Sequence, residues 1–336
     1  MRNTVRCALW LGLGTTLAGD EPAPLQRFAF EKAEMGLPFR ITLFAPDEQT
    51  AKAASDAALA RVEALNGVLS DYDDESEISR LSRTSGSGKA VPLSDDLWRV
   101  LERGQAMAER TDGAFDVTVG PLVNLWRRAR RKQELPSPEL IAEMRARVGF
   151  RHLKLDAEKR TAELLIADMR LDVGSIGKAY AVDAALAVLQ ARGITRALVG
   201  GSGDMAAGDP PPGLPGWRIE VAALDAEGAP PPRIVHLANR GIATSGDVFQ
   251  RVEIDGKRYS HIVDPHTGLG LTDHSLVTVI AADCFTANCY TTSASVLRPE
   301  RGLKLIDATP GIAALLVRKP GEKIEFVESR EWKAVR

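Results

Sequence analysis

The chain has 336 residues, of which 44% are hydrophobic and 26% are charged, values that are ordinary for a globular protein with one or two domains. Its formal net charge of −2 excludes a nucleic-acid binder that relies on electrostatics alone, so no nucleic-acid partner is expected. Cys284 and Cys289 form neither a disulfide framework nor a common zinc pattern, and we expect buried thiols.

The first nineteen residues have the pattern of a secretory signal peptide, which is removed from a mature protein. Arg2 and Arg6 provide the basic start, and residues 8–17 form an apolar run that ends in small residues. The run is too short to span a bilayer, so no transmembrane span is expected in the mature chain; a buried N-terminal strand or helix is the alternative. Asp20 stands where a lipoprotein signal has Cys, which favours a periplasmic or otherwise exported protein without a lipid anchor.

Helical periodicity alternates with strand patterns along the first part of the chain. Helices are expected after the capping residues Asp47 and Ser94, from Ser137-Pro138 to Gly149, and from about Ser175 to Arg192. Strands are expected over residues 28–35, 39–45, 153–155, 162–166, 171–173 and 197–199.

The last part of the chain is richer in strands. They are expected over residues 217–222, 234–237, 249–254, 257–262, 276–281, 313–317 and 323–327. Asp255-Gly256 is a strong signal for a hairpin turn, and one helix is expected over residues 285–297. Because this order is not a regular βαβ repeat, it predicts an α+β fold with mixed or antiparallel sheets and packed helices. After a flexible start over residues 20–26, residues 27–336 are expected to form a single domain.

The densest group of reactive side chains lies in residues 258–268, directly after an expected strand. His261 follows Tyr259 and Ser260, and Asp264 precedes a proline that turns the chain away. A lone histidine in a strand is more often structural than catalytic. Here the neighbouring carboxylate and hydroxyl groups favour proton transfer, to which an ordinary pKa of about 6.5 is suited.

Two segments are candidates for phosphate binding. Residues 200–203 are rich in glycine and follow a strand, so they can expose N–H groups to a phosphate; a tight turn is an equally good interpretation. Asp172 precedes a turn, and Lys178 and Asp183 lie on the following helix, whose N-terminus suits an anion. A surface lysine and an aspartate on a helix face are the structural alternative.

Three other groups are open to two interpretations. Phe115 and Asp116 can meet an adenine or a ribose, although a core Phe with a capping Asp is simpler. Residues 127–132 form a basic run that most simply lies on a solvated loop or helix face, and alternatively docks an acidic partner. Asn288 and Thr292 carry oxygen atoms at i and i+4, on one helix face, which suits a hard metal ion.

In this order, these segments resemble the FAD:protein FMN transferases, also called the ApbE family, from about Met35 to Leu316. The motifs that carry the resemblance are Met35-Gly36, residues 69–72 with 74–77, 113–118, 171–183, 200–204, 244–246 and 259–268. The resemblance implies that residues 27–336 form an ApbE-like flavin transferase domain with FAD in a central cleft.

The resemblance also implies a reaction: Mg²⁺-dependent transfer of FMN from FAD onto a Thr or Ser hydroxyl of an exported partner protein, with release of AMP. By resemblance, FAD is contacted by Met35, Tyr72, Ala114, Phe115, Asp116, Asp172, Ile262 and Val263. The metal lies among Ser175, Asn288 and Thr292, with Ser175 acting through its main-chain oxygen. His261 deprotonates the acceptor hydroxyl, and Lys178 meets a phosphate.

One departure from the family pattern affects the metal. The family has Ala-Asp-x-x-x-Thr where this chain has Ala287-Asn288 and Thr292, so the amide offers an oxygen but no charge. At an effective dielectric near 20, a unit charge lost about 4 Å from a unit cation costs about 4 kcal/mol, so weaker Mg²⁺ binding is expected. Two alternatives therefore stay open: an FAD-binding protein with weakened or lost transfer, and an FAD pyrophosphatase that uses water as the acceptor.

Overall fold

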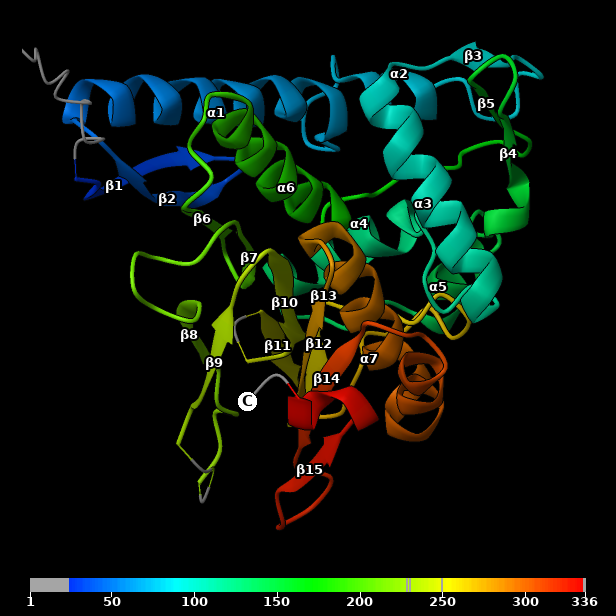
Figure 1. Cartoon of the computed structure of the whole chain (residues 1–336). Helices are drawn as coiled ribbons and strands as arrows, with labels where there is room; N and C mark the ends of the chain where they lie inside the picture. Colours follow the sequence, from blue (N-terminus) through cyan, green and yellow to red (C-terminus); the bar gives the residue numbers. More distant parts are fainter. Residues whose placement is uncertain (1–23, 228, 230, 249, 335–336) are drawn as a thin grey trace, which may run out of the picture.

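The computed structural model describes residues 24–334 except 228, 230 and 249, so the signal-peptide prediction for residues 1–19 lies outside the described residues. Its centre is an eight-stranded sheet in the order β1-β2-β6-β7-β10-β13-β14-β15 (Figure 1). Its strands are β1 (Gln26–Glu34), β2 (Leu37–Ala45), β6 (Ala197–Gly201), β7 (Asp204–Ala207), β10 (Arg240–Gly246), β13 (Ser275–Ala281), β14 (Ala313–Arg318) and β15 (Glu325–Glu328). Neighbouring strands pair antiparallel throughout this sheet, which confirms the predicted α+β class.

Seven α-helices and three small sheets surround the central sheet in the described part of the chain. The helices are α1 (Glu48–Leu69), α2 (Glu77–Ser82), α3 (Asp95–Thr111), α4 (Gly120–Lys132), α5 (Pro138–Arg145), α6 (Ile176–Ala191) and α7 (Cys284–Asp307). The small sheets are β3 (Val91–Pro92) with β5 (Thr161–Leu164) and β4 (Leu153–Asp156), β8 (Trp217–Val221) with β9 (Arg233–Leu237), and β11 (Arg251–Ile254) with β12 (Lys257–Ser260). No helix among the described residues is both long and apolar enough to cross a membrane.

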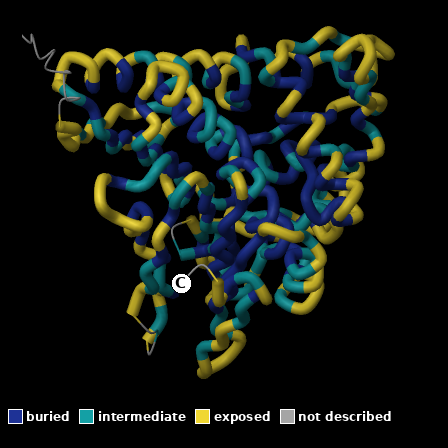
Figure 2. The backbone as a smooth tube through the Cα atoms, viewed as in Figure 1, coloured by how far each residue is buried: buried dark blue, intermediate teal, exposed yellow. Residues whose placement is uncertain are grey.

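The two faces of the central sheet carry different partners. Side chains alternate along a strand, so Val277 and Val279 of β13 pack with α1, α6 and α7, whereas Leu276 and Ile280 point to the other face. There they pack with the β8–β9 hairpin and with Trp332, which is fully buried. The buried residues accordingly form one cluster on each face of the sheet. Buried residues lie in the interior of the molecule, and exposed residues lie at its periphery (Figure 2).

Local sequence signals explain where the first helices begin. Asp47 accepts a hydrogen bond from the backbone N–H of Thr50 at 2.7 Å, and Ser94 accepts one from Leu97 at 3.2 Å, as the predicted caps require. The apolar face of this first helix is buried in full and includes Ala54, Ala58, Val62, Leu65 and Leu69. The predicted Asp255-Gly256 turn also joins β11 to β12, with both residues at positive φ.

A third apolar cluster connects the β11–β12 hairpin to the α4–α5 region. Trp126 of α4 packs against Tyr259 of β12 with ring centroids 5.1 Å apart, and its indole N–H donates to the Gly268 carbonyl at 2.8 Å. This contact holds the chain segment that follows β12 close to α4. The reactive residues 258–268 are therefore fixed next to a helix that is remote in sequence.

Several predictions of secondary structure were wrong. Residues 171–173 are extended but not a strand, because Asp172 N–H bonds to the Val117 carbonyl without a continuing ladder. The predicted helix up to Gly149 ends at Arg145. The glycine-rich segment, in contrast, is the tight turn of the β6–β7 hairpin, with Ser202 at φ 60°, which confirms one of its two interpretations.

Two helices and three strands were not predicted at all: α2, α4, β3, β7 and β10. Helix α4 begins without a side-chain cap, and β10 contains glycines at both ends of a short apolar stretch. Gly241 is required there because a Cβ atom would lie 2.0 Å from the backbone nitrogen of Cys284, at the start of α7. Helix α7 also continues past the predicted end, through a kink at Arg298 that precedes Pro299.

Candidate active site

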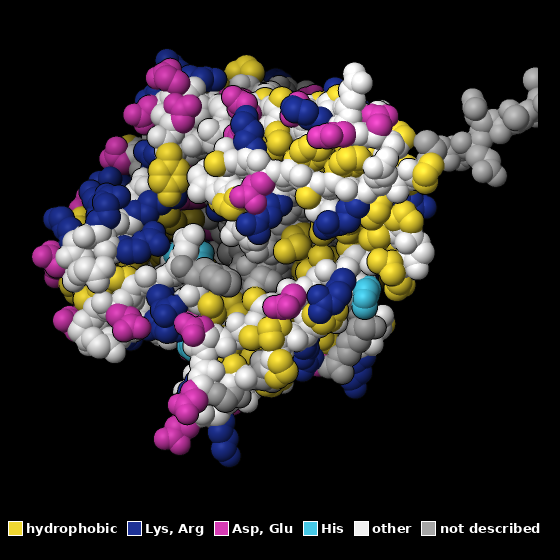
Figure 3. Space-filling view, turned by 90° about the vertical axis from the view of Figure 1, so that its left-hand side faces the viewer, with side chains coloured by type: hydrophobic (Ala, Val, Ile, Leu, Met, Phe, Trp, Pro, Cys, Tyr) yellow, Lys and Arg dark blue, Asp and Glu magenta, His cyan; other side chains and the backbone are white. Residues whose placement is uncertain are grey.

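A cavity of about 740 Å³ lies between the helices and the segment after β12. Its lining comes from the β1–β2 turn, the end of α1, α4, the start of α6, α7 and residues 261–265. Figure 3 shows one face of the molecule hollowed, with Lys and Arg side chains gathered on one side of the hollow. The volume is in the range of small-molecule and cofactor sites.

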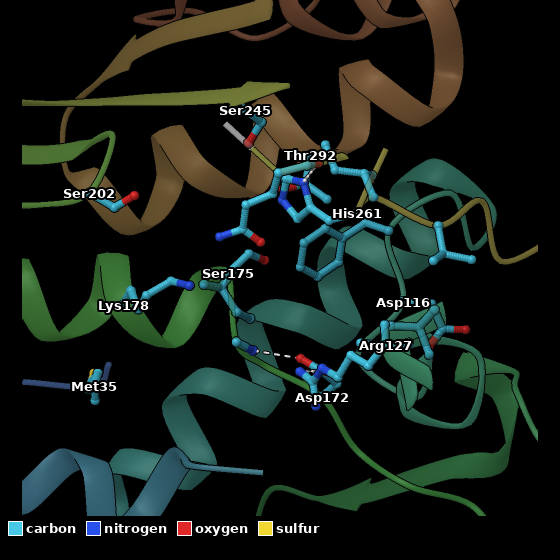
Figure 4. A pocket seen from close by; sticks show the side chains of 18 of the residues that line it. Met35, Asp116, Arg127, Asp172, Ser175, Lys178, Ser202, Ser245, His261 and Thr292 are labelled. Atoms are coloured by element: carbon cyan, nitrogen blue, oxygen red, sulfur yellow. Dashed lines mark hydrogen bonds and ion pairs between the residues drawn. The ribbon is translucent and has the colours of Figure 1, made fainter. Parts of the chain in front are cut away.

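Nearly all predicted site residues line this one cavity, although they come from six separate parts of the chain (Figure 4). They are Met35, Tyr72, Ala114, Phe115, Asp116, Asp172, Ser175, Lys178, His261, Ile262, Val263 and Thr292. Asn288 is the exception: it is only 4% exposed and lies one turn before Thr292, behind the cavity wall.

His261 has a defined hydrogen-bonding state. Its Nδ1 lies 3.0 Å from the Gln250 carbonyl, which can only accept, so Nδ1 carries the proton and Nε2 has a free lone pair. The residue is open to solvent on the cavity side, but protein surrounds the rest of the ring. This burial, with a smaller contribution from nearby Lys178, lowers the pKa of His261 to about 4. The imidazole is therefore neutral at pH 7 and can accept a proton.

The start of α6 provides a second polar group on the cavity wall. Gly174, Ser175 and Ile176 line the cavity, and Ser175 occupies the N-cap position without a side-chain capping bond. Lys178 extends from the first turn of the same helix and has no hydrogen bond or ion pair with any other described residue. A helix N-terminus and an unpaired ammonium group favour an anion at this point.

Arg127 holds two carboxylates at the edge of the cavity. Its guanidinium donates to Asp71 and, at 2.9 Å, to Asp172, and all three side chains are largely buried. Burial first, and Asp71 second, raise the pKa of the Asp172 carboxyl. The same guanidinium lies 4.3 Å from the ring centroid of Tyr72, which is 78% exposed. An exposed aromatic ring held at the cavity edge can stack on a flat ligand.

Asp116 is more constrained than a ligand-binding carboxylate needs to be. It accepts from Thr118 N–H and Oγ at 2.7 Å each, and from Phe150 N–H at 2.8 Å. The neighbouring Phe115 is buried in the main core. This geometry supports the structural interpretation of both residues, a core Phe with a carboxylate that shapes the turn, although both also line the cavity.

The sequence analysis did not identify the partner of Asn288. Its amide Nδ2 donates to both carboxylate oxygens of Asp204, at 3.0 and 3.1 Å, while its Oδ1 has no hydrogen-bond partner among the described residues. Asp204 is buried, which raises its pKa to about 7, although the Asn288 amide opposes that rise. In the sequence, Asp204 only ends a glycine-rich segment, and that position does not reveal a partner on α7.

The residues present fit a hard metal ion. Within the described ranges no cluster of three or more His, Cys, Asp and Glu forms a metal site, which excludes a zinc-type ligand set there. Ser175 and Thr292 line the cavity, and the buried Oδ1 of Asn288 lacks a partner one turn from Thr292. Oxygen donors with a buried carboxylate behind them suit Mg²⁺, which takes few protein ligands and keeps waters or phosphate oxygens.

Comparison with known proteins agrees with this geometry. Residues 35–316 match the ApbE family. The chain is 32% identical to the FAD:protein FMN transferase of Klebsiella pneumoniae (strain 342), covering 94% of this chain and 91% of that protein. It is 30% identical to the Escherichia coli (strain K12) enzyme of the same name, covering 94% and 92%.

Solved structures show the same likeness. The flavin transferase ApbE from Vibrio cholerae matches with a TM-score of 0.83 at 29% identity, covering 93% of this chain and 100% of that one. The apo form of the Pseudomonas stutzeri flavinyl transferase ApbE matches with a TM-score of 0.81 at 30% identity, covering 93% and 97%.

Proposed function

This chain belongs to the ApbE family and is a transferase, and we propose that it moves FMN from FAD onto a Thr or Ser hydroxyl of a partner protein. The hydroxyl oxygen forms a bond to the FMN phosphorus, and the bond from that phosphorus to the bridging oxygen breaks, so AMP leaves. The observation that carries the proposal is the placement of a neutral imidazole, an unpaired lysine and a helix N-terminus around one cavity.

His261 is the proposed general base. Because Nδ1–H is committed to the Gln250 carbonyl, the free Nε2 accepts the proton of the acceptor hydroxyl as its oxygen attacks. The lowered pKa keeps this nitrogen unprotonated at neutral pH. A positioned base of this kind contributes roughly 10²- to 10⁴-fold to the rate.

The diphosphate of FAD is proposed to lie against the start of α6. Lys178 supplies a point charge, and the uncapped N-terminus at Ser175 supplies backbone dipoles. Ser175, Asn288 and Thr292 would hold Mg²⁺ beside it, and the bound ion would neutralise phosphate charge and stabilise the leaving AMP. Positioning and electrostatics supply most of the rate in phosphoryl transfer.

The flavin and adenine rings are proposed to occupy the apolar and aromatic parts of the cavity. Met35, Ile262 and Val263 offer apolar surface, and the exposed ring of Tyr72 offers a stacking surface. The acceptor reaches the reacting phosphorus through the open side of the cavity. We also propose that the protein works outside the cytoplasm, on an exported acceptor, because of the signal-peptide pattern in residues 1–19.

One observation favours a second candidate, an FAD-binding protein with weakened or lost transfer. Asn288 is neutral and lies behind the cavity wall, so the metal site is poorer in charge than a carboxylate at this position would make it. An FAD pyrophosphatase, in which water replaces the acceptor hydroxyl, uses the same cavity.

One experiment separates these activities. The protein is incubated with FAD, Mg²⁺ and a set of synthetic peptides that each contain one Thr, and the products are followed by mass spectrometry and chromatography. Transfer predicts a peptide that carries FMN together with an equal amount of AMP. Free FMN with AMP indicates the pyrophosphatase, and intact bound FAD indicates a binding protein. The proposal fails if no peptide, and no candidate redox protein offered in its place, gains FMN while FAD remains bound.

A further inference from the structure

A groove rich in arginine adjoins the cavity, and no step of the proposed FMN transfer uses it. It has a volume of about 470 Å³ and shares Tyr72 and Arg127 with the cavity. Its other lining residues are Asp71, Pro121, Asn124, Arg128, Arg131, Met144, Arg147, Asp168 and Arg170. We propose that this arginine groove docks an acidic segment of the acceptor protein, an inference that rests on the proposed transferase function.

The charge of the groove stands out against the rest of the molecule. Its lining contains five arginines and two aspartates, and the carboxylates of Asp172 and Glu143 pair with Arg127 and Arg147 from outside the lining, which gives +5 − 4 = +1, in a chain whose formal net charge is −2. A positive groove on a protein of slightly negative charge selects an acidic partner by charge complementarity. It also steers that partner toward the cavity edge that the groove shares.

Two kinds of arginine line the groove, those paired with another residue and those without a partner, and Arg147 belongs to the first kind through Glu143 at 2.7 Å. Arg127 and Arg170 are tied down by Asp71, the first through its carboxylate and the second through its carbonyl oxygen. Arg128 and Arg131 are exposed, lie three residues apart on α4, and have no hydrogen bond or ion pair within the described part of the chain. The groove thus has fixed arginines at its base and two free guanidinium groups at its rim. Free guanidinium groups bind carboxylates in a bidentate manner.

A purely structural role explains only part of this arrangement. Basic residues in the last turn of a helix interact favourably with its dipole, and Arg130, Arg131 and Lys132 meet that requirement for α4. Arg128 lies outside that last turn, and Arg147 and Arg170 come from other segments of the chain. Arg147 and Arg170 have structural partners in Glu143 and the Asp71 carbonyl, so Arg128, which has no partner among the described residues, is the arginine that needs another explanation.

The groove is also a poor second site for the FAD phosphates. Lys178 and the start of α6 already offer an anion site inside the cavity, and they do not line the groove. An acidic peptide fits better, because several carboxylates on a flexible chain match several arginines spread along a surface. Continuity with the cavity then places a hydroxyl near such a segment within reach of His261.

The test compares two labelled peptides in both binding and transfer. They share one Thr and differ only in three flanking Asp residues, which become Asn in the second peptide. With the FAD-loaded protein, fluorescence anisotropy is expected to show about tenfold tighter binding of the acidic peptide, or about 1.4 kcal/mol. In the double variant Arg128→Glu/Arg131→Glu this preference is expected to disappear or reverse. Raising the salt concentration should weaken the preference in the unaltered protein.

A matched control makes the result specific to the groove. Arg218 is an exposed arginine on β8, away from both cavity and groove, and Arg218→Glu should leave the preference unchanged. FAD affinity should be equal in all three proteins. Equal binding of both peptides by the unaltered protein overturns the inference, and so does loss of FAD affinity in the double variant, which assigns the groove to FAD. Binding and transfer are measured in separate assays. Absence of transfer to either peptide therefore counts against the proposed function alone.

Discussion

The Asn288 amide donates to both oxygens of a single carboxylate, that of Asp204, at 3.0 and 3.1 Å. A carboxylate can only accept, so this pairing fixes the orientation of the amide and leaves its Oδ1 as the atom without a partner. A carboxyl group therefore lies next to position 288, on Asp204, but burial raises its pKa to about 7, so only part of its negative charge is present at neutral pH. The expectation of a metal site poor in charge rested on position 288 alone and did not include the neighbouring Asp204.

Asn288→Asp is consequently expected to destabilise the metal-free protein. It replaces the only side chain that donates to the Asp204 carboxylate among the described residues by a second acceptor, and two buried carboxylates then lie side by side. We expect a loss of about 1–3 kcal/mol in the free energy of unfolding in EDTA. Mg²⁺ should raise the melting temperature of this variant more than that of the unaltered protein.

Thermal melts with EDTA and with Mg²⁺ check this expectation. Thr292→Val serves as the control, because it removes an oxygen donor without adding a charge. An Asn288→Asp protein as stable in EDTA as the unaltered one would contradict the account of the Asp204 pair.

His261 should give the reaction an unusual pH dependence. Its pKa is lowered to about 4, so the neutral, active form predominates above that pH and is lost as the pH falls through it. The kcat/KM profile, which reports the free enzyme, should stay level from pH 7 down to about 5 and fall below it. An imidazole with an ordinary pKa would lose activity near pH 6.5.

His261→Asn should lower kcat by at least about 100-fold with FAD binding unchanged. His236→Asn, on the outer face of β9, is the matched control and should leave kcat as it is. A decline in kcat/KM centred near pH 6.5 would show that burial does not control this imidazole.

Much of the fold follows from local signals. The caps at Asp47 and Ser94, the Asp255-Gly256 turn and most strands were predictable, because each depends on a few neighbouring residues. Helix α4 was not, since it has no capping side chain and is held by Trp126 packing on the distant hairpin. A segment stabilised by tertiary contacts leaves a weak local pattern.

The candidate site, like the fold, was predictable from the sequence only in part. Motifs identified which residues gather around the cavity, and the structure brings them to its lining except Asn288 and Asp183, which instead accepts from the backbone N–H groups of Cys284 and Phe285 at the start of α7. Pairings across long sequence separations were beyond the motifs, among them Asn288 with Asp204 and Arg127 with Asp71 and Asp172. Such contacts depend on how elements pack, and a single sequence does not show the packing.

Cys284 and Cys289 should be chemically inert in the folded protein. Both are buried and free, as predicted, and burial raises the pKa of Cys289 to about 12 and that of Cys284 well above its ordinary value. Since the thiolate is the reactive form, a thiol reagent at pH 8 should label neither residue until the protein unfolds. Labelling followed by mass spectrometry, with and without denaturant, measures this. Rapid modification of Cys289 in the native protein would show that α7 opens locally.

Arg127 is expected to be the most important single charge for stability near the cavity. Arg127→Met keeps the aliphatic volume but leaves Asp71 and Asp172 buried without their shared guanidinium. Breaking a buried ion pair in this way costs about 3–5 kcal/mol, measured by urea denaturation at pH 7. The pKa of Asp172 is already raised by burial, so its carboxyl takes up a proton readily, and the loss of stability should shrink as the pH falls toward 5.

Adding Asp71→Asn and Asp172→Asn to Arg127→Met should restore most of the stability, because no uncompensated charge then remains. If the triple variant is as unstable as Arg127→Met alone, Arg127 stabilises the fold through its packing on Tyr72 rather than through its charge.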